Sequence, residues 1–100
     1  MGLGPQPGGN ATALNVTAAA VIKATPGTLF RVAVSAPGSA GALTLNDNTA
    51  LTGNAAANAI VSIPYGSLAA GQIITLDWPC AAGIVVSAVP TGGVFAATFS

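Results

Sequence analysis

The sequence predicts an all-β protein: a single compact β-sandwich of about seven strands, either immunoglobulin-like or a small jelly roll, with an extended N-terminal arm. Short segments rich in Val, Ile, Thr and Phe are separated by Gly, Pro, Asn and Ser at intervals of about 8–15 residues. Several segments alternate apolar and polar residues, as strands with one buried face do. No long helical pattern lies between them, so we expect turns rather than crossover helices to connect the strands.

The arm comprises residues 1–11, and the sandwich domain residues 12–100. The arm sequence, MGLGPQPGGNA, has four glycines and two prolines and no periodic apolar pattern. This composition favours an extended or flexible segment. We expect it to bind a partner protein, lying in a groove or adding a strand to a sheet; the alternative is a disordered terminus. The residues expected to make this contact are Leu3, Pro5, Gln6 and Pro7.

The first half of the domain contains three expected strands. Residues 13–23 form a nearly continuous apolar run, whose buried face cannot be assigned from its period. Residues 28–35, TLFRVAVS, alternate clearly and place Phe30, Val32 and Val34 in the core, with Arg31 on the opposite face. Residues 41–46 form the third strand.

The second half contains four more. Residues 54–59, NAAANA, are expected to be a loop with one turn of helix, followed by strands at 59–64, 72–78, 83–89 and 94–99. Strand 72–78 turns Ile74, Leu76 and Trp78 inward, and strand 94–99 contributes Phe95 and Phe99 to the core.

Two Pro-Gly pairs flank the strand at 28–35. Pro26-Gly27 and Pro37-Gly38 suit the central positions of type II turns, because proline restricts φ and glycine accepts a positive φ.

Composition excludes several classes of function. Charged residues make up 4% of the chain, which has no His, no Glu and one Cys. A Ser-His-Asp triad, a His or Cys zinc site and a redox CxxC pair therefore cannot form, and we expect no enzyme activity, metal or cofactor. Two basic residues cannot neutralise a run of phosphates, so nucleic acid is excluded as a partner. A membrane-spanning segment is not expected either, because Gly and Pro interrupt every apolar run before about 18–20 residues.

The four charged residues, Lys23, Arg31, Asp47 and Asp77, are candidates for ion pairs within a subunit or across an interface. Asp47 is otherwise expected to cap a turn, and Asp77 to point outward from its strand. Cys80 is interpreted as a buried small hydrophobic residue. Zero net charge and a small core both favour assembly with other copies or partners, because free monomers need surface charge to stay dispersed.

Four stretches, AAVIKATPGTLFRVAVS, LTLNDN, ANAIVSIP and LDWPCAAGIVV, resemble small β-rich proteins encoded among the structural genes of tailed bacteriophages. The resemblance covers about four-fifths of the chain and includes no catalytic motif. It implies a virion component made in the host bacterial cytoplasm: a head decoration or cement protein, expected to be a homotrimer, that binds the major capsid protein on the capsid exterior. The alternative is a fibre or adhesin subunit that binds a host glycan through loops 46–58 or 64–71, the latter containing Tyr65.

Overall fold

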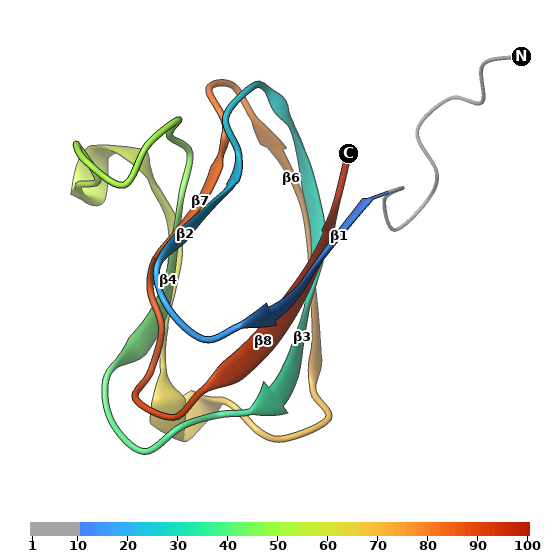
Figure 1. The fold of residues 1–100 in the computed structure, drawn as a ribbon, viewed down its shortest axis with the longest axis vertical. Helices are drawn as coiled ribbons and strands as arrows, with labels where there is room; N and C mark the ends of the chain where they lie inside the picture. Colours follow the sequence, from blue (N-terminus) through green and yellow to red (C-terminus); the bar gives the residue numbers. More distant parts are fainter. Residues whose placement is uncertain (1–10) are drawn as a thin grey trace, which may run out of the picture.

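A computed structural model describes residues 11–100 as two four-stranded sheets packed face to face, which confirms the predicted all-β sandwich (Figure 1). Sheet A has the strand order β1-β8-β3-β6, and sheet B has the order β2-β7-β4-β5. The strands are β1 Ala11–Val16, β2 Ala20–Lys23, β3 Gly27–Ala36, β4 Ala42–Asn46, β5 Ala59–Pro64, β6 Ile73–Cys80, β7 Ile84–Ala88 and β8 Val94–Phe99.

The strand pairing is that of one long hairpin folded over on itself. β1 pairs with β8, β2 with β7, β3 with β6 and β4 with β5, all antiparallel, and the loop between β4 and β5 is the tip of this hairpin. Pairing of β3 with β8 and of β4 with β7 then joins the halves into two sheets. This order is that of an eight-stranded jelly roll, which decides between the two sandwiches that the sequence left open.

The expected single strand at 13–23 is in fact two strands in different sheets. β1 belongs to sheet A and β2 to sheet B, and residues 17–19 cross between them (Figure 1). Asn15 has a φ of 55°, which breaks the extended backbone near the end of β1. The continuous apolar run concealed this break, so residues 11–100 contain eight strands rather than seven. The arm residues Leu3, Pro5, Gln6 and Pro7 lie outside the described residues.

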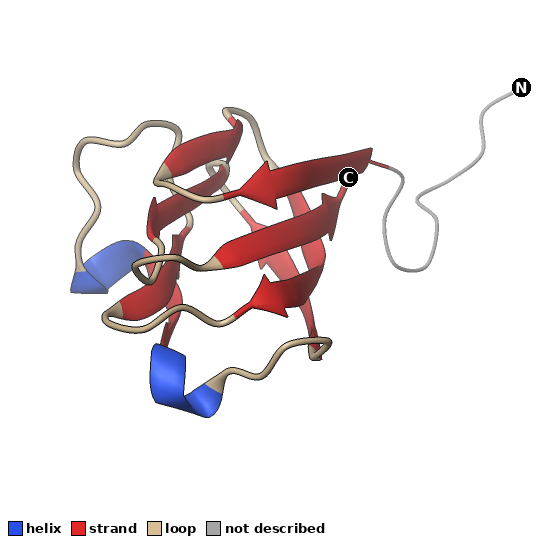
Figure 2. Cartoon of the chain, turned by 60° about the horizontal axis from the view of Figure 1, so that its bottom comes forward, coloured by secondary structure: helices blue, strands red, loops and turns tan. Residues whose placement is uncertain are grey.

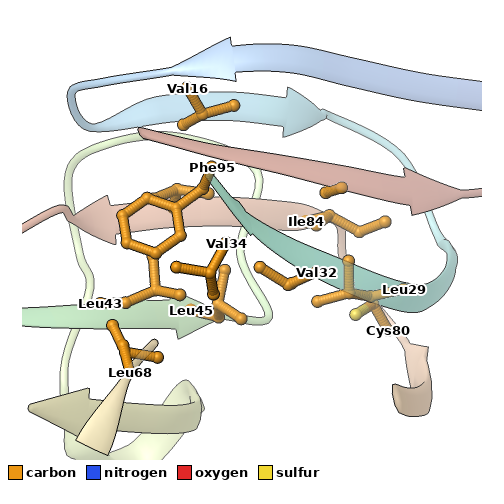
Figure 3. Close-up of a cluster of buried hydrophobic side chains, with 12 residues drawn as sticks. Val16, Leu29, Val32, Val34, Leu43, Leu45, Leu68, Cys80, Ile84 and Phe95 are labelled. Atoms are coloured by element: carbon orange, nitrogen blue, oxygen red, sulfur yellow. The ribbon is translucent and has the colours of Figure 1, made fainter. Parts of the chain in front are cut away.

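The core lies between the sheets and receives side chains from both (Figure 3). Val32, Val34 and Phe95 are buried at its centre, while Ile74, Leu76 and Phe99 are partly buried against it. The other buried members are Val16, Leu29, Leu43, Leu45, Leu68, Cys80, Ile84, Val86 and Ala97.

Two residues predicted to lie in the core, Phe30 and Trp78, lie outside it. The pairing of β3 with both neighbours slips between Leu29 and Arg31, so Leu29 enters the core and Phe30 is only half-buried. On β6, Asp77 has a φ of 48°, which interrupts the alternation just before Trp78. Trp78 is consequently 46% exposed on an edge strand instead of lying inside.

The two Pro-Gly pairs differ. Gly38 has a φ of 89°, as the type II turn requires, but Gly27 is not among the residues with positive φ and instead begins β3. Glycine is needed at position 27 for another reason: a Cβ there would collide with the carbonyl oxygen of Ser100.

Two helical turns lie in loops outside the strand layers (Figure 2). The first, Ala56–Asn58, confirms the turn of helix expected in 54–59, and the second is Tyr65–Ser67. Among residues 11–100, no helix is long and apolar enough to cross a membrane.

Candidate functional site

Within residues 11–100 the charged residues Lys23, Arg31, Asp47 and Asp77 make no ion pair with one another, so the predicted pairing does not occur inside the described part of one subunit; pairing across an interface stays a prediction. Lys23, at the end of edge strand β2, donates from Nζ to the carbonyl oxygen of Ser100 at 2.8 Å. Asp47 accepts from backbone N–H groups. Arg31 and Asp77 are exposed in sheet A.

Asp47 holds the loop between β6 and β7 against the start of the 47–58 loop. Its Oδ2 accepts the N–H of Ala81 at 2.9 Å, and its Oδ1 accepts those of Ala82 at 2.8 Å and Gly83 at 3.2 Å. Burial by itself would raise the pKa of this carboxyl, but the three donors outweigh that effect and hold the pKa below its usual value. Asp47 therefore accepts hydrogen bonds from the backbone of a turn, as expected, but the turn lies more than 30 residues away in sequence.

Cys80 lies beside this clamp and is buried, as expected. Burial, together with the negative charge of Asp47, raises the pKa of the Cys80 thiol to about 11. A thiol with so high a pKa is protonated at neutral pH and is a poor nucleophile. Within the described residues, no group of three or more His, Cys, Asp or Glu side chains is placed to bind a metal ion.

Asparagines organise the loop at the tip of the hairpin. The buried Asn46 donates to Asn58 Oδ1 at 2.7 Å and accepts from Ser87 Oγ at 2.6 Å. Asn48 donates to the carbonyls of Ala50 and Thr52 and to Asn54 Oδ1. Sequence reasoning missed this network, although four asparagines between positions 46 and 58 were its visible signal, since Asn readily bonds to nearby backbone.

The outer face of sheet A is a candidate for contact with another protein. Register places two rows of side chains on this face, because residues directly opposite each other share a face. The polar row contains Thr12, Thr98, Arg31 and Thr75, and the apolar row contains Ala96, Ala33 and Ile73. Leu14 of β1 lines the same depression as the apolar row. Leu14 and Ile73, on the two edge strands, are 73% and 59% exposed. Small alanines between them leave a shallow depression of about 130 Å³.

A second depression, of about 310 Å³, lies over sheet B beside the 47–58 loop. Its lining includes the hydroxyl groups of Thr44, Ser62 and Ser87 and the amide of Asn54. Thr44 Oγ1 and Ser62 Oγ are 3.0 Å apart and share a hydrogen bond. This surface can exchange hydrogen bonds with a polar ligand.

The two loops named as alternative glycan-binding loops do not form one site. Loop 46–58 precedes β5 and loop 64–71 follows it, so they lie at opposite ends of that strand (Figure 1). Tyr65 is 42% exposed and does not line the depression over sheet B.

Comparison with protein families, with curated proteins and with solved structures finds no match to this chain.

Proposed function

We propose that the protein is a structural virion protein of a tailed phage that decorates and stabilises the capsid exterior as an oligomer, a trimer being the expected form. The exposure of large apolar side chains on a chain with four charged residues is the observation that carries this proposal. These side chains are Leu14, Val21, Leu51, Tyr65, Ile73 and Trp78. Apolar surface of this kind, with little charge to keep copies apart, suits a part that is covered by other proteins.

The jelly roll agrees with this proposal by analogy, since viral capsid and lectin domains use the same strand order. A compact sandwich of about 9.5 kDa is small enough to occupy a capsid lattice in many copies. Several weak contacts per oligomer then sum to tight attachment. In this proposal, the major capsid protein is the partner, and the Gly- and Pro-rich arm reaches a neighbouring capsomer.

The test compares particles that carry the protein with particles that lack it. We expect the decorated capsids to withstand higher temperature, and a reconstruction of the particle to place the protein outside the shell at three-fold or quasi-three-fold positions. Replacing Leu3, Pro5 and Pro7 by serine should weaken capsid binding, whereas the control Ala70→Ser, at an exposed loop residue, should not. Equal heat resistance with and without bound protein would refute the stabilising role.

Recognition of a host-surface glycan is the second candidate function, because hydroxyl and amide side chains stand among alanines in the lining of the depression over sheet B. Its weakness is the lack of an aromatic side chain on which a sugar ring would stack. Binding of the purified protein to host cells, lost in Thr44→Val with Ser62→Ala and retained in Tyr65→Ala, would support this function over capsid decoration.

A further inference from the structure

The outer face of sheet A is apolar along one row and carries opposite charges nearby. Ala33 pairs with both Ala96 and Ile73, and Leu14 lines the same depression from β1. With strands about 4.8 Å apart, this apolar row extends for about 14 Å across the sheet. Leu14 and Ile73 stand at its ends with more than half of their surface in solvent, and the alanines between them leave room for side chains of a facing molecule.

The two charges on sheet A are not used within residues 11–100. Lys23 is bonded to Ser100 and Asp47 to three backbone N–H groups. Arg31 and Asp77, by contrast, are exposed on adjacent strands, where Arg31 pairs in register with Thr75, two residues from Asp77. The face therefore presents one positive and one negative group of its own. A second copy of the same face supplies the matching charges in the reverse order.

The sheet edges are poorly suited to adding a strand, which favours contact through the face. β1 has a register irregularity at Asn15, and β6 carries Asp77 in a left-handed conformation followed by Pro79. β2 has four residues and ends at Lys23, while β5 ends at Pro64. Irregularities, prolines and lysines at sheet edges hinder edge-to-edge pairing.

We infer that copies of this chain contact one another through the outer face of sheet A. Leu14 and Ile73 of each copy cover the alanines of a neighbour, and Arg31 of one copy lies beside Asp77 of the other. The inference rests on the self-association in the proposed function, and not on the capsid or on the expected trimer, so it is tested on the purified protein alone.

The experiment is sedimentation of the complete chain from micromolar to near-millimolar concentration. The wild type should sediment as a species of twice 9.5 kDa, because a face that contacts the same face of a second copy pairs two copies. Leu14→Thr and Ile73→Thr should each raise the dissociation constant by on the order of ten- to a hundredfold, the cost of losing one buried aliphatic side chain. The matched control is Val21→Thr, an exposed aliphatic residue of sheet B, which should leave the constant unchanged.

The charge contact has its own test in Arg31→Gln, Asp77→Asn and the double variant. Asparagine tolerates the left-handed backbone at position 77. Each single variant should weaken association, and the double variant should weaken it no more than either single one, because both remove the same pair. If the wild-type oligomer does not dissociate in this concentration range, the rate of subunit exchange between differently labelled oligomers is measured instead of the dissociation constant. The variants should then exchange subunits at least tenfold faster than the wild type.

Three results would overturn the inference. One is a monomer at every concentration, which leaves capsid attachment to be tested separately. Another is an oligomer that Val21→Thr weakens while Leu14→Thr and Ile73→Thr do not. The third is that the effects of Arg31→Gln and Asp77→Asn on association are fully additive in the double variant, which would show that the two residues do not contact each other. Urea unfolding of each variant, monitored in parallel, separates weakened association from loss of the fold.

Discussion

The Oδ1 atom of Asp47 accepts the backbone N–H of Ala82 at 2.8 Å, and this bond joins the tip of the folded hairpin to the loop that connects sheet A with sheet B. Two further N–H groups bond to the same carboxylate. A single side chain thus closes a loop of more than 30 residues. Removal of this carboxylate should therefore lower the free energy of unfolding of the whole sandwich.

Asp47→Asn should lower the free energy of unfolding by about 1–3 kcal/mol, because the amide keeps the shape but replaces one acceptor by a donor that faces an N–H group. Partial exposure of Asp47 limits the loss. Urea unfolding measures it. Thr49→Ser is the control, since Thr49 is exposed in the same loop and its replacement should change stability by less than about 0.5 kcal/mol.

Stability should also depend on pH through Asp47. The pKa of this carboxyl is lower in the folded chain than its ordinary value of 3.8, so the unfolded chain binds the proton more readily. The contribution of Asp47 is therefore complete above pH 3.8 and is lost as pH falls through the folded pKa. The difference in unfolding free energy between wild type and Asp47→Asn should shrink as the pH falls below 3.8. A difference that stays constant down to the lowest pH would contradict this explanation.

Gly83→Ala should destabilise the protein by about 1–3 kcal/mol or more, because a Cβ at this position would collide with the backbone carbonyl oxygens of Asn48 and Lys23. Gly66→Ala is the control, since a Cβ there meets no atom within 4 Å. Thermal unfolding of the two variants checks the contrast. Equal effects would show that the loss at position 83 does not come from this close approach.

Asn46→Ala should lower the free energy of unfolding by about 1–3 kcal/mol, because it removes the partly buried hydrogen bonds of Asn46 with Asn58 and Ser87. The loss should be local first: amide exchange should rise in the 47–58 loop more than in sheet A, which hydrogen exchange measured by residue can resolve. Uniformly faster exchange in both sheets would contradict the assigned role of Asn46 in this loop.

Cys80 should resist alkylation in the folded protein. The residue is 4% exposed and the pKa of its thiol is raised to about 11, so at pH 8 only about one molecule in a thousand carries the thiolate. Adding urea should accelerate the reaction with iodoacetamide in parallel with unfolding. Rapid modification without denaturant would show that the β6–β7 loop opens readily.

Prediction from sequence succeeded where one local pattern decides the structure, as in the Val32 and Val34 alternation and the turn of helix before Asn58. It failed at Phe30 and Trp78, because a slip in register or a left-handed residue moves a side chain to another face without changing composition. It also missed the Asp47 clamp, whose donors are backbone groups that have no sequence signature.

The amino-acid sequence by itself determined the all-β class and the positions of most strands, since these depend on local period and composition. Only the tertiary structure decided that the run 13–23 divides between two sheets and that the sandwich is a jelly roll. It also decided that Lys23 and Asp47 bond to backbone groups, whereas Arg31 and Asp77 are exposed. The physical reason is the same in each case: strand order, register and the partners of Asp47 and Lys23 depend on contacts between segments far apart in the chain.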